Sequence, residues 1–476
     1  MAGFQEYEEY DALGLAALVR RKAVTPVELL DAAMARLARH NPRINAVCHV
    51  FEGEARARIA AGLPVGPFTG VPYLLKDLYA LYAGQPTANG SRFYQGFVAD
   101  HDSTLVERLK AAGLVIFGKT NTPEFGLSTS TEPALFGPSR NPWSLAHSAG
   151  GSSGGAAAAV AARLLPTAHA TDGGGSIRIP AACCGLYGLK PTRGRNPAGP
   201  DVGEGWAGMA AAHAVTLSVR DSAALLDATA GPAVGDPYWA PPPGRRFLEA
   251  LDEKRRHLRI AVMTKAPADV PVHPACTAAV EQAARLLGDL GHRIEPAAPT
   301  YEADLLRRAA RDIICANVRN GLELRGKALG REPRPDDVEP ITWAQAEQGR
   351  RLSAADYARA TQTVHRISRQ ILAFFERHDM LLTPALAEPP LRLGELSMAC
   401  DDLAGYLRRL LQFTPFTAMF NATGQPAAVL PFASTAEGLP IGVQLVARFG
   451  EEAELLKLSA DLEAARPWFG RRPSLQ

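Results

Sequence analysis

The chain has 476 residues, and 47% of them are hydrophobic, which is enough for a substantial buried core. Its 51 basic and 49 acidic residues nearly cancel without a long basic run, so neither nucleic-acid binding nor attraction to an anionic membrane surface is expected. The sequence contains no uncharged apolar run of about 18 residues, so no transmembrane helix is expected. The acidic N-terminal stretch lacks the apolar segment of a signal peptide.

Cysteine and histidine usage indicates a reduced protein without a metal centre. No CxxC motif occurs, and adjacent cysteines rarely bridge each other, so free thiols in a cytoplasmic protein are expected. The eleven histidines show no ligand spacing such as HExxH, which argues against zinc. The six cysteines are Cys48, Cys183, Cys184, Cys276, Cys315 and Cys400.

Helices and strands alternate along the first half of the chain. Thr25 and Glu28 can form a capping box at the start of a helix that runs to about residue 40. The further expected elements are strands at 46–51, 71–75, 114–117 and 166–171, and helices at 103–112, 155–165 and 177–184. The alternation indicates an α/β fold.

The second half begins with an irregular stretch, 195–212, and resumes the alternation after a proline-rich connection, 232–244. The expected helices are 218–228, 273–290, 303–329, 353–378 and 451–464, and the expected strands are 258–263, 293–296, 380–383, 427–430 and 442–446. At this length two or three domains are usual, although large α/β enzymes often remain a single domain.

Two glycine–serine clusters, 150–155 (GGSSGG) and 173–176 (GGGS), dominate the sequence. A phosphate-binding loop is disfavoured because no Lys-Ser/Thr ends either cluster and GxGxxG is absent. Residues 150–154 match the GxSxG pattern of a nucleophile elbow, but the preceding stretch 138–149 is polar and turn-rich rather than a strand. A serine esterase would also need His and Asp partners that the sequence does not identify.

A third interpretation is a serine nucleophile activated by lysine. Ser176 follows three glycines whose N–H groups could converge on an oxyanion. Ser152 could relay the Ser176 proton to a neutral lysine, and Lys76 closes a buried apolar strand. A lysine in that place can also reach solvent or pair with Asp77.

The residues around these clusters resemble a known family. The stretch 150–195 resembles the amidase signature, with GGSSGG, DGGGSIRIPA and CGLYGLKPTRGR in order. Further similar segments are 70–77 (GVPYLLKD), 118–125 (GKTNTPEF), 424–427 (GQPA) and 439–444 (LPIGVQ). The resemblance covers nearly the whole chain, least closely at about 230–400.

The resemblance implies an α/β/α sandwich around a large mixed β-sheet, formed as a single domain by residues 1–476. The signature core would occupy about 70–200, and a more variable helical region about 230–400. It also implies a Ser–cis-Ser–Lys triad, with Ser176 as nucleophile, Ser152 after a cis peptide bond, and Lys76 as base. The implied oxyanion donors are the N–H groups of Gly173, Gly174, Gly175 and Ser176. Gly173 departs from the family, where Thr or Ile is more usual.

A narrower resemblance concerns substrate binding. The segments 204–206 (EGW) and 212–215 (AHAV) are similar to a group that includes the 6-aminohexanoate cyclic-dimer hydrolases. Cys315 falls roughly where that group places a pocket residue. Trp206, His213 and Cys315 are therefore candidate substrate-binding residues, although burial in the core is the favoured explanation for His213 and Cys315.

Together these features predict an amidase that hydrolyses a small-molecule amide to acid and amine, or ammonia, through an acyl-enzyme. Nylon-oligomer-like, aryl and carbamate compounds are candidate substrates. No metal or organic cofactor is expected, nor a nucleic-acid or membrane partner, and a homodimer is compatible with the sequence. The alternatives are an A-type amidotransferase component, which acts inside a partner complex, and a serine esterase.

Overall fold

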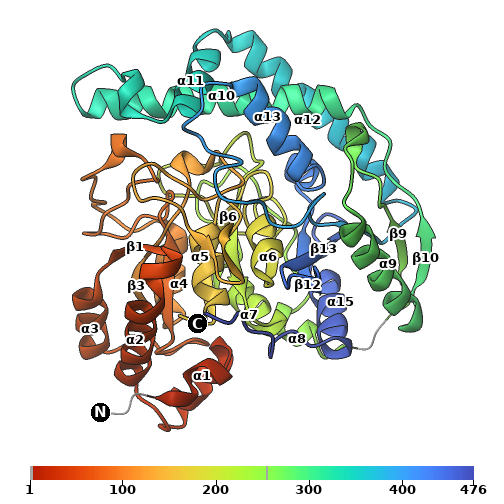
Figure 1. The fold of residues 1–476 in the computed structure, drawn as a ribbon. Helices are drawn as coiled ribbons and strands as arrows, with labels where there is room; N and C mark the ends of the chain where they lie inside the picture. Colours follow the sequence, from red (N-terminus) through yellow and green to blue (C-terminus); the bar gives the residue numbers. More distant parts are fainter. Residues whose placement is uncertain (1–3, 254–255, 476) are drawn as a thin grey trace.

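The structure is a computed structural model that describes residues 4–253 and 256–475. It contains an eight-stranded mixed sheet with the strand order β10-β9-β11-β13-β12-β7-β8-β6. Figure 1 shows β6 near the centre of the molecule and β9 and β10 at its right-hand side. β9 runs parallel to β10 and β11, and the other neighbours are antiparallel. The strands are β6 (Thr167–Asp172), β7 (Tyr187–Lys190), β8 (Ala211–Thr216), β9 (Arg259–Val262), β10 (Arg293–Pro296), β11 (Met380–Pro384), β12 (Ala427–Ser434) and β13 (Pro440–Ala447).

A second sheet carries the predicted lysine. It contains β1 (Val47–Val50), β3 (Val115–Thr120) and β2 (Pro72–Lys76), in the order β1-β3-β2. β2 lies beside β6 of the large sheet, and the Lys76 N–H donates to His169 Nδ1 in β6 over 3.2 Å. Lys76 therefore ends its strand at the junction of the two sheets. A short hairpin, β4 (Arg140–Asn141) with β5 (Ser144–Ser148), precedes the first glycine–serine cluster.

Helices cover both faces of the large sheet. In β12, Val429 packs into a cluster with α5 and α6, whereas Ala428 and Leu430 pack into a cluster with α7, α9 and α15. The helices are α1 (Ala12–Arg20), α2 (Pro26–Ile44), α3 (Glu52–Ala61), α4 (Thr104–Ala111), α5 (Gly154–Ala161), α6 (Arg178–Cys184), α7 (Val219–Thr229), α8 (Phe247–Ala250), α9 (Pro274–Asp289), α10 (Ala303–Ala328), α11 (Pro340–Arg350), α12 (Ala354–Phe374), α13 (Leu403–Phe413), α14 (Met419–Thr423) and α15 (Glu452–Ala465). This arrangement confirms the predicted α/β/α fold.

Local sequence signals explain several helix boundaries. Thr25 and Ser353 cap α2 and α12 through capping boxes, as their spacing to Glu28 and Asp356 predicts. α5 ends earlier than the predicted helix, because the chain leaves the helical conformation near Arg163, whose φ is +57°. The predicted irregular stretch 195–212 ends where β8 begins.

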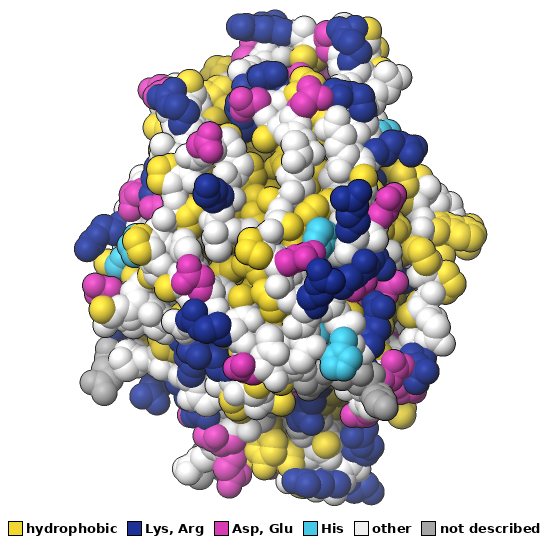
Figure 2. Space-filling model, turned by 90° about the vertical axis from the view of Figure 1, so that its right-hand side faces the viewer, with side chains coloured by type: hydrophobic (Ala, Val, Ile, Leu, Met, Phe, Trp, Pro, Cys, Tyr) yellow, Lys and Arg dark blue, Asp and Glu magenta, His cyan; other side chains and the backbone are white. Residues whose placement is uncertain are grey.

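The surface carries charges of both signs. Figure 2 shows the side of the molecule where α9 and β10 lie, and on it Lys and Arg are interspersed with Asp and Glu around a central area of hydrophobic side chains. Over residues 4–253 and 256–475, no helix combines the length and the apolar character that crossing a membrane requires.

Candidate active site

Lys76 is buried at the end of β2, and its side-chain nitrogen faces two hydroxyls. Nζ donates to Ser152 Oγ over 2.7 Å and to Thr171 Oγ1 in β6 over 2.9 Å. Burial holds the pKa of Lys76 well below its ordinary value, and the charge of Asp172 only partly opposes this. Neutral Lys76 can accept a proton from Ser152, the exchange that a relay requires.

Ser152 lies in the loop between β5 and α5, and the peptide bond between Gly151 and Ser152 is cis, as predicted. The backbone at Gly126 lies close to the Ser152 hydroxyl. A Cβ at Gly126, whose φ is +70°, would stand 3.1 Å from Ser152 Oγ. A side chain at Gly126 would therefore crowd the hydroxyl that receives the hydrogen bond from Lys76.

Ser176 follows the second glycine cluster and is nearly buried, with 9% of its surface exposed. Its carbonyl accepts a hydrogen bond from the Ser153 N–H over 3.3 Å, which joins the two glycine–serine clusters. Among the described residues its hydroxyl has no hydrogen-bond partner, so this oxygen is free to meet a substrate. Hydrogen bonds in a relay often tighten only when the substrate is bound.

Asp172 orders the glycine loop from within. Its Oδ1 accepts from the Gly175 N–H over 2.7 Å, and its Oδ2 accepts from the Ile177 N–H over 3.2 Å. The Gly175 N–H is thus already engaged. The N–H groups of the other three predicted oxyanion donors, Gly173, Gly174 and Ser176, make no hydrogen bond to any residue that the structure describes.

A buried arginine holds Asp172 in turn. Arg178 Nε and Nη2 donate to the two carboxylate oxygens of Asp172, each over 2.9 Å. Although burial alone would raise the pKa of Asp172, the charge and hydrogen bonds of Arg178 hold it below its usual value. No sequence pattern indicates this pair beforehand, although both residues lie inside the signature stretch.

The C-terminal part of the chain supports the same loop. Arg178 also donates to the Thr417 carbonyl and to Gln444 Oε1, over 2.9 and 2.7 Å. Thr417 Oγ1 donates to the Gly174 carbonyl over 2.6 Å, and Asn421 Nδ2 donates to the Asp172 carbonyl over 2.9 Å. No local motif around Thr417 or Asn421 signals this role, because it depends on contacts across the fold.

Trp206 packs directly against the first glycine of the loop. A Cβ at Gly173 would stand 2.6 and 2.7 Å from Cζ3 and Cε3 of the Trp206 ring. This contact gives a physical reason for glycine at a position where the family usually has a larger residue. The half-buried indole therefore lies against the backbone of the candidate oxyanion hole.

The other two candidate pocket residues have structural contacts. His213 in β8 shares a hydrogen bond of 2.9 Å with Ser222 Oγ in α7, and burial lowers the pKa of His213 to about 4. Cys315 is buried in α10, where its Sγ contacts Gln348 Oε1 at 3.5 Å. These contacts explain both residues as parts of the packed core. A role of either residue in substrate binding stays a prediction.

Comparison with known proteins identifies the family. The model of the family described as Amidase matches residues 28–456. The chain belongs to the amidase family. It is accordingly a hydrolase that acts on amide bonds.

Among the relatives of this amidase is the 6-aminohexanoate-cyclic-dimer hydrolase of Paenarthrobacter ureafaciens, which is 41% identical over 98% of this chain and 96% of its own. A solved structure of a 6-aminohexanoate cyclic dimer hydrolase complexed with substrate superimposes with a TM-score of 0.93 at 39% identity, covering 98% of this chain and 99% of the other. A glutamyl-tRNA(Gln) amidotransferase component from Thermotoga maritima is less similar, with a TM-score of 0.75 at 26% identity over 98% and 97%.

Proposed function

We propose that this amidase hydrolyses small-molecule carboxylic amides through an acyl-enzyme on Ser176, with Ser152 as proton relay and Lys76 as base. The observation that carries the proposal is the 2.7 Å hydrogen bond between Lys76 Nζ and Ser152 Oγ in a fully buried site. Burial lowers the pKa of Lys76, and this favours the neutral amine, which is the form able to accept a proton and start the reaction.

In the first half-reaction Ser176 Oγ attacks the carbonyl carbon of the amide. The Ser176 proton passes to Ser152 Oγ, and the Ser152 proton passes to Lys76 Nζ. The oxyanion receives hydrogen bonds from the N–H groups of Gly173, Gly174 and Ser176, which have no other described partner. The proton then returns along the same route to the nitrogen of the leaving amine, and the C–N bond breaks.

In the second half-reaction water replaces the amine. Water attacks the acyl carbon, its proton follows the relay to Lys76, and the return of that proton to Ser176 Oγ releases the acid. One water is consumed for each amide bond that is cleaved, and no redox change occurs. The buried Asp172–Arg178 pair holds the loop in place throughout and takes no part in proton transfer.

Similarity to the 6-aminohexanoate cyclic dimer hydrolases supports a linear or cyclic amide of an aliphatic amino acid as the substrate class. Aryl amides and carbamates are the alternative substrates against which it should be compared. The relative of 41% identity is named for the 6-aminohexanoate cyclic dimer. An amidotransferase component is a weaker candidate, because its structural similarity is lower, at a TM-score of 0.75 against 0.93. A Ser–His–Asp esterase is disfavoured, because Lys76 rather than an imidazole donates to Ser152.

The experiment is an assay of the purified chain on cyclic and linear 6-aminohexanoate oligomers, aryl amides, carbamates and glutamine. We expect amide cleavage without any partner protein, and loss of at least about a thousandfold in kcat for Ser176→Ala. Ser459→Ala is the control, because it also removes a buried serine hydroxyl, one that bonds only within α15 and to Tyr187. Full activity of Ser176→Ala would refute the proposal, and glutaminase activity alone would favour the amidotransferase class.

The proposal includes a cytoplasmic location, which the free state of all six cysteines supports. It also includes a homodimer, which light scattering on the purified chain tests directly.

A further inference from the structure

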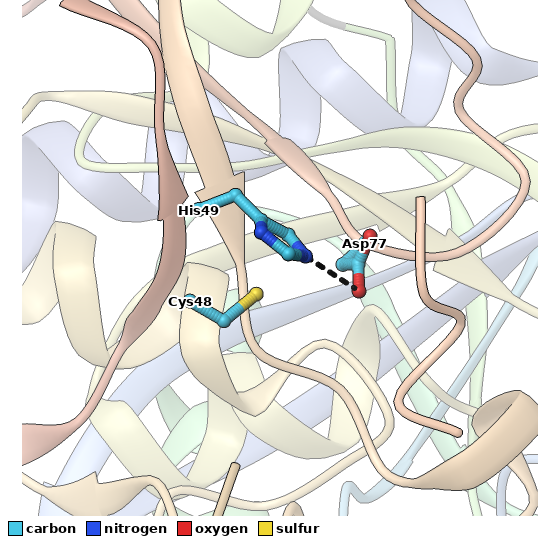
Figure 3. A group of neighbouring side chains, drawn as sticks. All are labelled: Cys48, His49 and Asp77. Carbon is cyan, nitrogen blue, oxygen red and sulfur yellow. Dashed lines mark ion pairs between the residues drawn. The ribbon is translucent and has the colours of Figure 1, made fainter. Parts of the chain in front are cut away.

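An irregularity in β1 brings two chemically reactive side chains to the same side of the strand. Val47 pairs with Thr120 and His49 pairs with Lys119, so Cys48 is an extra residue with no partner of its own in β3. Neighbours in a regular strand point to opposite faces, whereas a β-bulge can turn a side chain toward its neighbour's side. Figure 3 shows that Cys48 and His49 both point toward Asp77, the residue after β2.

The three side chains are arranged as metal ligands are. Cys48 Sγ, a ring nitrogen of His49 and a carboxylate oxygen of Asp77 all lie within 4.8 Å of one another. His49 Nε2 stands 3.7 Å from Asp77 Oδ2, beyond hydrogen-bond distance. Two ligand atoms of a tetrahedral zinc ion lie about 3.3–3.6 Å apart, so closure around an ion needs roughly 1 Å of side-chain movement.

One ligand atom lacks a hydrogen-bond partner. The Nε2 atom of His49 is buried and accepts or donates no hydrogen bond within the described residues. A buried polar atom without a partner is costly, and a bound ion would satisfy it. Asp77, in contrast, is held in place, because both of its carboxylate oxygens accept from the Ala88 N–H, over 3.0 and 3.2 Å.

We propose that Cys48, His49 and Asp77 form a binding site for one divalent cation of the zinc type. Thiolate, imidazole and carboxylate are all ligands of Zn²⁺ and of Co²⁺. Cys48 binds as thiolate and its proton passes to the solvent, so the thiolate and the carboxylate together balance the charge of the ion. Asp77 is completely buried, whereas Cys48 and His49 each keep part of their surface exposed, so the site lies near the surface of the protein.

A neighbouring lysine limits the affinity without occupying the site. The charge of Lys119 interacts with Asp77 and Cys48, and it would repel a cation. Its Nζ, however, is anchored elsewhere, because it donates to the Ala80 carbonyl over 3.0 Å and to Thr87 Oγ1. A bound ion would link β1 to the segment that follows Lys76. It would take no part in acyl transfer, so the proposal stands independently of the proposed function.

The test is a titration of the metal-free full chain with Co²⁺, followed by its thiolate-to-metal absorption band, and with Zn²⁺ by calorimetry. We expect one ion per chain, and at least tenfold weaker binding with loss of the band in Cys48→Ser. His49→Gln should weaken binding to a similar extent. Cys400→Ser is the matched control, because it removes an exposed thiol in another part of the chain and should bind like the native protein.

Circular dichroism of each variant confirms that it folds, and His49→Gln keeps the test decisive should Cys48→Ser fail to fold. The proposal would be overturned if the native chain bound no ion, or if the cobalt band survived in Cys48→Ser and vanished in Cys400→Ser. Equal zinc affinity of the native chain and His49→Gln would overturn it as well.

Discussion

At the scale of single residues, burial decides whether Lys76 is a cation or a base. A lysine in water holds its proton at neutral pH, but Lys76 has no exposed surface and shares its hydrogen bonds with two neutral hydroxyls. The main opposing influence is the charge of Asp172, which Arg178 already pairs. The arrangement thus favours neutral Lys76 in the resting enzyme.

The first prediction concerns the dependence of activity on pH. Acidification protonates Lys76, so kcat/KM should fall as the pH drops, with a midpoint well below the ordinary lysine value of 10.5. Lys76→Met should be inactive at every pH, because it removes the base while filling the same space. Measurement of kcat/KM across the stable pH range tests this, and a profile that keeps rising beyond about pH 10 would contradict a lowered pKa.

The second prediction concerns the contact between Gly173 and Trp206. Gly173→Ala should lower kcat about tenfold or more, because the new methyl group would collide with the indole ring and displace the oxyanion loop. Adding Trp206→Ala should restore part of that loss, since the obstacle is removed. Kinetics of the two single variants and the double variant measure the coupling. Trp239→Ala, which alters an exposed tryptophan, is the control, and strictly additive effects would contradict the contact.

At the scale of elements, the sequence predicts strands with a continuous apolar run well and strands without one poorly. The apolar runs at β2, β3 and β11 are short and continuous, so their positions follow from hydrophobicity alone. The sequence does not indicate β7 and β8, because YGLK contains a glycine and AAHAVT is rich in alanine, and neither is a strong strand signal.

The bulge in β1 shows that the sequence also fails to predict the cluster of Cys48, His49 and Asp77. Metal-binding motifs such as HExxH have fixed ligand spacings, which the adjacent residues Cys48 and His49 do not match. Two adjacent residues in a regular strand would point apart, so Cys48 and His49 gave no signal. Their convergence on Asp77 depends on one extra residue in the pairing with β3, which only the structure reveals.

The third prediction concerns two neighbouring buried glutamates, Glu339 before α11 and Glu124 in the 3₁₀ turn η3 (Glu124–Gly126). Glu339, which precedes α11, donates its N–H to Glu124 Oε2 over 2.7 Å. Burial, with the nearby Glu124, raises the pKa of Glu339 to about 7 from an ordinary 4.5. The folded chain therefore binds this proton more tightly than the unfolded chain. The associated stability is complete below pH 4.5 and is lost as the pH rises through 7.

Glu339→Gln should remove this loss, which is on the order of 3 kcal/mol between those two pH values. The variant should be less sensitive to pH than the native chain and more stable above neutrality. Chemical unfolding at several pH values measures the difference. Glu332→Gln changes an exposed glutamate nearby and should follow the native curve, and parallel curves for native and Glu339→Gln would contradict the prediction.

At the scale of the whole molecule, the hydrophobic clusters share the strands of one sheet. Leu445 of β13 packs into the cluster of α9 and α15, while its neighbour Val446 packs into the cluster of α10 and α12. Trp206 contacts two of the clusters. If one cluster came apart, it would expose one side of strands whose other side packs into a remaining cluster.

The fourth prediction follows from this sharing and tests the expectation of a single domain. Unfolding by denaturant should be one cooperative transition, with the same midpoint by circular dichroism and by tryptophan fluorescence. The five tryptophans report on separate parts of the chain, from Trp143 to Trp468. Two separated transitions would show that the helical region at 230–400 folds as an independent unit.

The triad and its supports differ in how far the sequence predicts them. Ser152 and Ser176 lie in one continuous signature stretch and Lys76 in a second motif, so a resemblance can identify all three. Thr417, Asn421 and Gln444 support the candidate oxyanion loop through contacts that span more than 200 residues. No local pattern marks Thr417 or Asn421, because their contacts depend on how the chain folds. Gln444, in contrast, ends the family-like segment 439–444 (LPIGVQ), although its contact with Arg178 cannot be inferred from that segment.

These distant supports also order events during synthesis. The ribosome finishes Arg178 long before its partners, which follow 239, 243 and 266 residues later. At usual elongation rates the last of them emerges roughly 15–50 s after the arginine. Until then Asp172 and the glycine loop lack their hydrogen bonds from Thr417 and Asn421, although Ser176 has already been synthesised. We therefore expect the nascent chain to carry Ser176 in an incompletely anchored loop, and amide cleavage to begin only after β12 and β13 have joined the sheet.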